Sequence, residues 1–301
     1  MRSGFIETEG GLRVFWQAAG SGPTLLCCNG VGVSTFFWKY VVEHFRDRYQ
    51  VVVWDYRGHG RSDRPLHPHA CDLSIQASAT DLGRVAEAVG ASEMVLLGHS
   101  MGCQVALERY RQAPESVAGL VLMLGSAGRV LDTFYDYPKS PKLIGAAYKV
   151  IDAIGDPVNR IVGSALRSPL AWRVTRGLSL VDPYYTRRED FLPYLEHLAS
   201  IDFRLFLRMV IEAQRHDAFD VLPQVTAPAL VVAAERDTFT PMWLSEKMAA
   251  EIPDASLLVL AEGSHAAIIE QPRSITHRLD RFLREKVRWS QQQERAPRRA
   301  S

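Results

Sequence analysis

The chain alternates between short apolar runs and longer segments in which apolar residues recur every three or four positions. Most runs are continuously apolar and rich in Val and Leu, as in parallel strands that are covered on both faces. They occupy residues 24–29, 50–55, 93–99, 117–124, 228–235 and 255–262. The helical segments occupy residues 35–47, 74–90, 101–113, 242–252 and 271–287. This alternation predicts an α/β fold with a doubly wound, mostly parallel sheet.

Three other parts of the chain depart from this rhythm. Residues 4–9 and 11–18, around Gly10 and Gly11, predict an antiparallel hairpin at the sheet edge. Over 130–222 the strand runs stop, and only proline-punctuated helical stretches follow, at 140–154, 157–167, 169–179, 188–199 and 202–216. We expect a core of residues 1–129 and 223–287, a helical cap or lid inserted over 130–222, and a solvated, disordered tail over 288–301.

The charge balance excludes some classes of partner. The chain has 35 basic and 34 acidic residues, which gives a formal net charge of +1. It therefore has no global field that would gather nucleic acid. Its apolar runs fall short of the ~18 residues of a membrane span, and the N-terminal segment has no signal-peptide core. We expect a cytoplasmic protein with no nucleic-acid partner and no membrane span, while the choice between monomer and homodimer stays open.

The four cysteines, Cys27, Cys28, Cys71 and Cys103, form no CxxC pair. Cys27 and Cys28 are neighbours on a predicted strand, so their side chains point to opposite faces and are poor disulfide partners. Buried, reduced thiols are the expectation. The sequence also contains no His, Cys, Asp and Glu set with metal-ligand spacing and no phosphate-binding glycine loop, so we expect neither a metal nor a cofactor.

A G-x-S-x-G motif at residues 98–102 has Ser100 at its centre. It joins a predicted buried strand to a predicted helix, which is the context that this motif requires. A sharp turn of this kind leaves no room for side chains at Gly98 and Gly102 and holds the serine hydroxyl clear of the sheet. It also directs the Met101 amide toward a developing oxyanion. Ser100 is the candidate nucleophile, and an inert serine in a packing turn is the alternative.

A serine nucleophile needs a base and an acid that orients this base. Among nine histidines, His265 follows a late strand run through a short polar turn, at the strand end where doubly wound folds place their chemistry. Asp237 stands in the same position after residues 228–235, and Glu235 is the alternative acid. The order Ser100, Asp237, His265 also fits the motif.

Four segments carry a resemblance to a known family: GHSMG (98–102), DYRGHGRSD (55–63), AAERD (233–237) and GSHAAIIEQP (263–272). In these segments the chain resembles the α/β-hydrolase superfamily, in the branch of serine hydrolases and carboxylesterases that carry a helical cap. The resemblance covers essentially everything outside the insertion and the tail. Serine at position 100, where dehalogenases and soluble epoxide hydrolases have aspartate, sets the chain apart from those branches.

The resemblance also implies roles for two loops. It makes residues 55–62 a structural loop. The residues themselves agree, since Gly58 and Gly60 suit a tight turn and we expect Arg57 to pair locally. It places the second oxyanion amide on Val31, within the loop that begins Asn29-Gly30. Asn29 departs from the histidine that is usual there, but an amide side chain can still brace the loop by hydrogen bonding.

The predicted reaction is acyl transfer to water through an acyl-enzyme on Ser100, with His265 as general base, Asp237 as orienting acid, and the Val31 and Met101 amides as oxyanion hole. Aromatic and aliphatic residues in 130–222 favour an apolar pocket and a small-molecule hydrophobic ester. A lactone of the acyl-homoserine type and carbon–carbon bond hydrolysis with the same triad are alternatives. A ligand-binding, receptor-like protein of this fold is the non-enzyme alternative.

Overall fold

A computed structural model describes residues 1–66, 69, 71–177, 181–182 and 184–290. An eight-stranded sheet runs in the order β1-β2-β4-β3-β5-β6-β7-β8. Its strands are β1 (Arg2–Glu7), β2 (Arg13–Ala19), β3 (Thr24–Cys28), β4 (Gln50–Trp54), β5 (Met94–His99), β6 (Val117–Met123), β7 (Ala229–Ala234) and β8 (Ala255–Leu260). The strands from β4 to β8 pair in parallel, whereas β1 and β2 form the predicted antiparallel edge hairpin.

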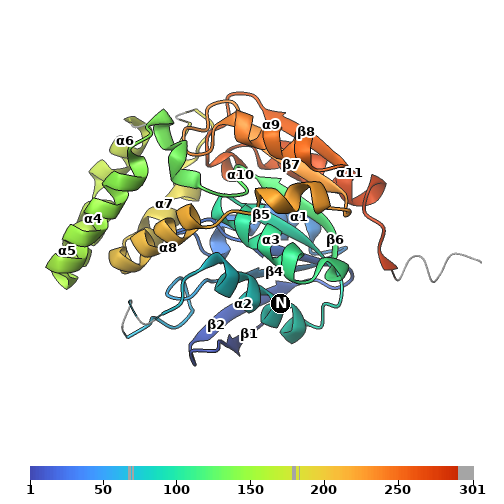
Figure 1. Cartoon of the computed structure of the whole chain (residues 1–301), viewed down its shortest axis with the longest axis horizontal. Helices are drawn as coiled ribbons and strands as arrows, with labels where there is room; N and C mark the ends of the chain where they lie inside the picture. The colour runs from blue at the N-terminus through green and yellow to red at the C-terminus, as the bar shows by residue number, and fades with distance from the viewer. Residues whose placement is uncertain (67–68, 70, 178–180, 183, 291–301) are drawn as a thin grey trace, which may run out of the picture.

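Helices cover both faces of the sheet (Figure 1). The core helices are α1 (Lys39–Phe45), α2 (Ile75–Val89), α3 (Met101–Gln112), α9 (Met242–Glu251), α10 (Ala267–Glu270) and α11 (Pro272–Glu285). Side chains of α2, α3 and α9 pack on one face, and those of α1 and α11 pack on the other. These elements confirm the predicted α/β fold. Their boundaries differ from the prediction by at most two residues, except that α1 begins four residues late because Thr35–Trp38 forms a 3-10 helix.

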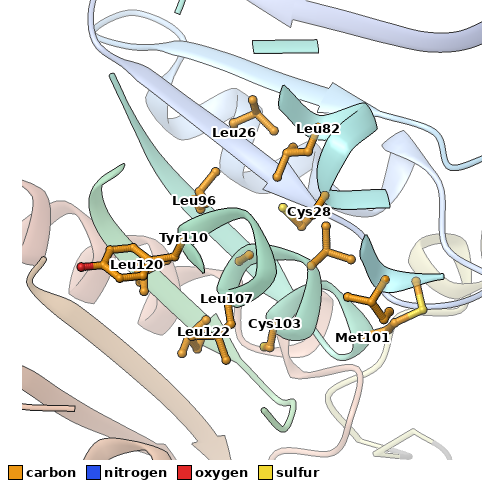
Figure 2. Close-up of a cluster of buried hydrophobic side chains, with 14 of the residues drawn as sticks. Leu26, Cys28, Leu82, Leu96, Met101, Cys103, Leu107, Tyr110, Leu120 and Leu122 are labelled. Carbon is orange, nitrogen blue, oxygen red and sulfur yellow. The ribbon is translucent and has the colours of Figure 1, made fainter. Parts of the chain in front are cut away.

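Alternation along the strands divides the core in two. Cys28 packs with α2 and α3, whereas its neighbour Cys27 packs with α1 and α11. Figure 2 shows how Cys103 and Leu107 of α3 lie over the sheet residues Leu96 and Leu122. All four cysteines are buried and unpaired, as expected. This packing fixes α3, and with it the turn that begins the helix, against the centre of the sheet.

Five helices lie between β6 and β7 in the sequence: α4 (Ser140–Ile154), α5 (Asp156–Arg167), α6 (Pro169–Gly177), α7 (Arg188–Leu198) and α8 (Phe203–Arg215). We call them the inserted helices. They gather beside the sheet, at the left of Figure 1. Their positions match the helical stretches predicted within residues 130–222.

The chain end differs from the prediction of a solvated tail that starts at residue 288. Trp289 is only 5% exposed and its ring lies 6.5 Å from that of Tyr49. Ser290 donates from both its amide and its hydroxyl to the carboxylate of Glu93, at 2.9 Å each. Packing of the indole therefore extends the core beyond residue 287, and residues 291–301 of the predicted tail lie outside the described residues. Across the described part of the chain, the helices are too short or too polar to cross a membrane.

Candidate active site

Ser100 occupies the turn between β5 and α3, with φ of 56° and ψ of −122°. A side chain on Gly102 would place Cβ 2.0 Å from the Cys28 carbonyl oxygen, and one on Gly98 would lie 2.5 Å from the Gly102 oxygen. The turn can therefore approach β3 this closely only because both flanking residues are glycines. The strained serine backbone is held by bonds from its amide to the Met123 oxygen and from the Cys103 amide to its own oxygen, each 3.0 Å.

His265 lies in the turn that follows β8, and Asp237 lies in the turn that follows β7. The His265 Nε2 atom is 3.0 Å from Ser100 Oγ, and its Nδ1 atom is 2.8 Å from Asp237 Oδ2. Because the buried carboxylate can only accept, Nδ1 carries the proton of the neutral ring and Nε2 is left to accept from the serine hydroxyl. The structure thus brings together three residues that are far apart in the sequence.

The Asp237 carboxylate has further donors that fix its direction. The amides of Phe239 and Thr240 donate to Oδ1, each at 2.9 Å, and the Thr240 hydroxyl donates to Oδ2 at 2.8 Å. The alternative acid, Glu235, is exposed and accepts a bond from the Glu262 amide at 3.2 Å. Asp237 therefore contacts the His265 ring, whereas the bond given for Glu235 is to the turn at Glu262.

Two rings hold His265 from the sides. Phe239 stacks on the imidazole with centroids 4.8 Å apart and an interplanar angle of 23°. The His99 Nε2 atom lies 3.1 Å from the His265 carbonyl oxygen. Burial, and then the nearby His265, lower the pKa of His99 to about 3, so this ring is neutral and donates through Nε2. Sequence reasoning missed both positioning roles.

Glu270 is a third residue that the sequence did not single out. Its buried carboxylate accepts from the Ser264 amide and hydroxyl, at 3.0 and 2.7 Å, next to His265. It also accepts from the Asp182 amide and the Thr186 hydroxyl, each at 2.7 Å, in the segment between α6 and α7. One carboxylate therefore ties the histidine turn to the inserted segment. Its place five residues after His265 was the available signal.

The loop after β3 faces the Ser100 turn. The side chain of Asn29 donates to the Trp54 oxygen at 2.6 Å and accepts from the Trp38 indole at 2.7 Å, so it braces the loop by hydrogen bonding. A Cβ on Gly30 would lie 3.1 Å from Ser100 Cβ, which is why the loop needs glycine there. Among the hydrogen bonds of the described residues, the amides of Val31 and Met101 donate to no acceptor. Both remain available to a ligand oxygen near Ser100.

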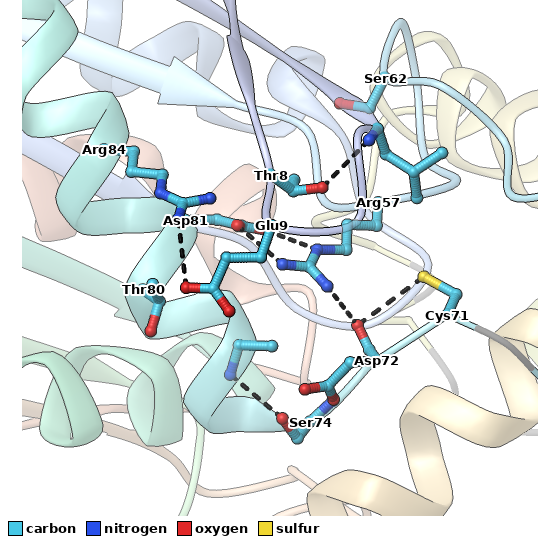
Figure 3. Close-up of polar contacts among 12 residues, drawn as sticks. Thr8, Glu9, Arg57, Ser62, Cys71, Asp72, Ser74, Thr80, Asp81 and Arg84 are labelled. Carbon is cyan, nitrogen blue, oxygen red and sulfur yellow. Dashed lines mark hydrogen bonds and ion pairs between the residues drawn. The ribbon is translucent and has the colours of Figure 1, made fainter.

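The loop of residues 55–63 has a structural role. The buried carboxylate of Asp55 accepts from the amides of Thr35 and Arg61, at 3.1 and 3.0 Å. Arg57 pairs with Asp81 through Nε at 2.7 Å and Nη2 at 2.9 Å, as Figure 3 shows. Asp81 belongs to α2, so Arg57 pairs locally, as expected from the sequence.

Two cavities meet at Ser100. The base-side cavity, of about 210 Å³, is lined by His265, His99, Phe37 and side chains of α5 and α7. The α8-side cavity, of about 140 Å³, is lined by Met101, Phe134 and side chains of α4 and α8. Val31, Phe206 and Phe239 line both cavities. The described residues contain no cluster of His, Cys, Asp and Glu that could hold a metal ion. The arrangement is suited to nucleophilic attack on an apolar small molecule.

The chain is similar along most of its length to two bacterial proteins that are named as hydrolases. The chain is 25% identical, over 84% of its length and 88% of the relative, to a protein of Azorhizobium caulinodans named "Putative carbamate hydrolase RutD". A Pseudomonas savastanoi protein of the same name is 26% identical over 87% of the chain and 93% of the relative.

The fold is shared with solved hydrolases. An esterase from Exiguobacterium antarcticum matches 93% of this chain and 99% of its own with a TM-score of 0.77 at 21% identity. Est816, described as an N-acyl homoserine lactone degrading enzyme, matches 93% of this chain and 100% of its own with a TM-score of 0.70 at 24% identity. The model of the alpha/beta hydrolase family matches residues 25–277, and the chain belongs to that family.

Proposed function

We propose that the protein is a serine hydrolase that cleaves a hydrophobic carboxylic ester through an acyl-enzyme. Ser100 is the nucleophile, His265 the general base and Asp237 the residue that orients the base. The observation that carries this proposal is the continuous path from Asp237 Oδ2 through His265 to Ser100 Oγ, with links of 2.8 and 3.0 Å.

In the first half of the reaction, Ser100 Oγ attacks the ester carbonyl carbon while its proton moves to His265 Nε2. The carbonyl oxygen becomes an oxyanion that accepts from the Val31 and Met101 amides. The bond between carbon and the alcohol oxygen then breaks, and the proton on Nε2 passes to the departing alkoxide. Free alcohol leaves, and the acyl group stays on Ser100.

Water completes the cycle in the second half. It gives a proton to His265 Nε2 as its oxygen attacks the acyl carbon, and the oxyanion forms again in the same hole. The bond to Ser100 Oγ breaks, the serine takes the proton back, and the carboxylic acid is released. Asp237 holds the ring in one tautomer through both halves, because its oxygens are fixed by Phe239 and Thr240.

The substrate class follows from the lining of the cavities, which is mostly aliphatic and aromatic around one polar centre. Carbamates are a second candidate, favoured by the relatives that carry a carbamate hydrolase name at about 25% identity. A carbamate presents the same carbonyl to Ser100 but keeps a polar nitrogen on the acyl side. We place esters first because the side chains around Ser100 are largely apolar.

Labelling with a fluorophosphonate probe tests the nucleophile. The experiment compares wild type, Ser100→Ala and His265→Ala. It measures labelling by the probe and the hydrolysis of p-nitrophenyl acyl esters and of the corresponding p-nitrophenyl carbamates. We expect labelling and turnover in wild type and loss of both in Ser100→Ala. A wild-type protein that is not labelled would contradict the proposal and favour a ligand-binding protein. If wild type hydrolyses the carbamates faster than the esters, carbamates become the first candidate substrate class and esters the second.

A further inference from the structure

The two cavities at Ser100 differ in which catalytic group they contain. His265 and Gly30 line the base-side cavity, whereas Met101 and Thr240 line the α8-side cavity. Ser100 and Val31 belong to both. A substrate carbonyl at Ser100, with its oxygen toward the two amides, therefore has one arm available to each cavity.

The substrate has two arms, the alcohol part and the acyl chain, and the leaving alkoxide's need for a proton decides which cavity each arm occupies. The leaving alkoxide must lie within hydrogen-bond reach of His265 Nε2 to be protonated, whereas the acyl carbon chain has no such need. We propose that the alcohol part of the substrate occupies the base-side cavity and the acyl chain occupies the α8-side cavity. This assignment rests on the proposed function and extends it to the form of the substrate.

The volumes set the size of each arm. A dry cavity of about 150 Å³ holds a benzene molecule. The α8-side cavity, at about 140 Å³, thus accepts an acyl chain of about six carbons. The base-side cavity is half as large again, at about 210 Å³. The preferred substrate is an ester of a short- to medium-chain acid with a bulkier alcohol.

One hydroxyl in the base-side cavity has no partner among the described residues. Nδ1 of His99 also lacks a partner there, but it can only accept, because the proton of this ring is on Nε2. The Thr175 hydroxyl donates to the Ala171 oxygen at 2.8 Å, and Ser100 is bonded to His265, but the Tyr194 hydroxyl forms no hydrogen bond with any described residue. Burial raises the pKa of Tyr194 to about 12, so the hydroxyl remains a donor at neutral pH. The Tyr194 hydroxyl would donate to an additional oxygen on the alcohol part of the substrate, separate from the oxygens of the ester group.

Two isomeric esters separate the arms, because each has a five-carbon chain on one side of the ester group. Methyl hexanoate carries this chain on the acyl side, and pentyl acetate carries it on the alcohol side. Val210→Phe narrows the α8-side cavity, and Leu166→Phe narrows the base-side cavity. Both residues are partly buried on inserted helices, so each variant is the control for the other.

We expect Val210→Phe to lower kcat/KM for methyl hexanoate about tenfold and to leave pentyl acetate within about twofold, with the opposite result for Leu166→Phe. The reverse pattern, or equal slowing of both esters by each variant, would overturn the assignment. Ser100→Ala with a fluorophosphonate probe is run in parallel. If wild type is labelled but hydrolyses neither ester, the two-arm assignment fails and the nucleophile stands; if labelling survives in Ser100→Ala, the proposed function itself fails.

Tyr194→Phe tests the polar group. The probes are pentyl acetate and 2-ethoxyethyl acetate, in which an ether oxygen replaces one methylene of the alcohol chain. Loss of one hydrogen bond should lower kcat/KM for the ether ester about fivefold and leave pentyl acetate unchanged. Equal effects on both esters would show a structural role for Tyr194 and overturn its assignment as a donor to the substrate.

Discussion

Helices of the core and the inserted helices differ in how much of their surface is buried. Most residues of α3 are buried against the sheet, whereas only Ser140 of the equally regular α4 is buried. Large apolar side chains stay exposed on the inserted helices, among them Leu143, Val150, Ile154, Ile161, Leu170 and Val174. Because apolar burial is the main source of stability, α4 is held much less firmly than α3.

The proposed chemistry follows this division. Ser100 and Asp237 lie in turns at the ends of β5 and β7, which are buried along their whole length, so dense packing resists small displacements there. His265 follows the edge strand β8, which is only partly buried. The inserted helices contribute walls to the two cavities and no member of the triad. In the proposed reaction, the core therefore holds the reacting groups, while the less buried inserted helices shape the space around them.

The largest expected effect tests whether the chemistry belongs to the core alone. Ser100→Ala should lower kcat about 10⁴-fold or more, since loss of a serine nucleophile disables the whole triad. Its unfolding free energy should stay close to that of wild type. Steady-state kinetics and urea unfolding measure the two quantities. An activity loss of similar size in Val210→Phe, on an inserted helix, would break the comparison.

A matched pair of glycines tests the difference in packing. Gly102→Ala in α3 places Cβ 2.0 Å from a backbone oxygen of β3 and should cost about 3 kcal/mol or more of unfolding free energy. Gly145→Ala in α4 meets nothing within 4 Å and should stabilise the helix by about 0.5–1 kcal/mol. Urea unfolding gives both values. Similar costs at the two sites would mean that α4 is packed as tightly as α3.

Two histidines lie side by side where the core meets the inserted helices, with ring centroids 5.7 Å apart, and both have a lowered pKa. Burial lowers the pKa of His59, in the core, to about 3 and that of His197, in α7, to about 4. Between about pH 6.5 and these lowered values, both histidines bind a proton in the unfolded chain but not in the folded chain. The free energy of unfolding therefore falls as the pH is lowered from about 6.5 toward 4 for His197 and toward 3 for His59. The slope is at most about 1.4 kcal/mol per pH unit for each histidine.

His59→Gln and His197→Gln should each make this slope shallower, and the effect of His59→Gln should persist to lower pH. Unfolding in urea at pH 7, 6, 5 and 4 tests this. A slope that neither variant changes would show that other groups govern the acid sensitivity.

The smallest expected effect concerns the contact between the regions. The buried carboxylate of Asp190 in α7 accepts from Lys39 Nζ and, at 2.7 Å, from the Tyr40 hydroxyl of α1. Asp190→Asn should cost about 1 kcal/mol, because Lys39 is partly exposed and solvent screens the pair. Amide hydrogen exchange should become faster in α7 and stay unchanged in β5. Asp156→Asn, in an exposed pair with Arg204, is the control. Equally faster exchange in both elements would contradict a local role.

The sequence predicted the position of a candidate site residue where the residues next to it in the chain determine the local turn. Ser100 between two glycines and His265 after a strand could be placed from their motifs, and the structure brings them within 3.0 Å. Glu270 could not, because two of its partners come from a segment between α6 and α7. Trp289 was likewise missed, since its polar neighbours predict solvent and only the folded sheet offers the pocket for its indole.

The pairing of β6 with β7 has a consequence for how the chain assembles. Leu120 pairs with Ala229, so the whole insertion separates two adjacent strands in the sequence. During synthesis the serine turn is complete long before β7 exists, and the edge of β6 that later meets β7 is then unpaired. Such a distant pairing is slow to form and exposes the unfinished sheet to aggregation. The order of the segments along the chain therefore leaves one edge of the early sheet open until β7 has been made.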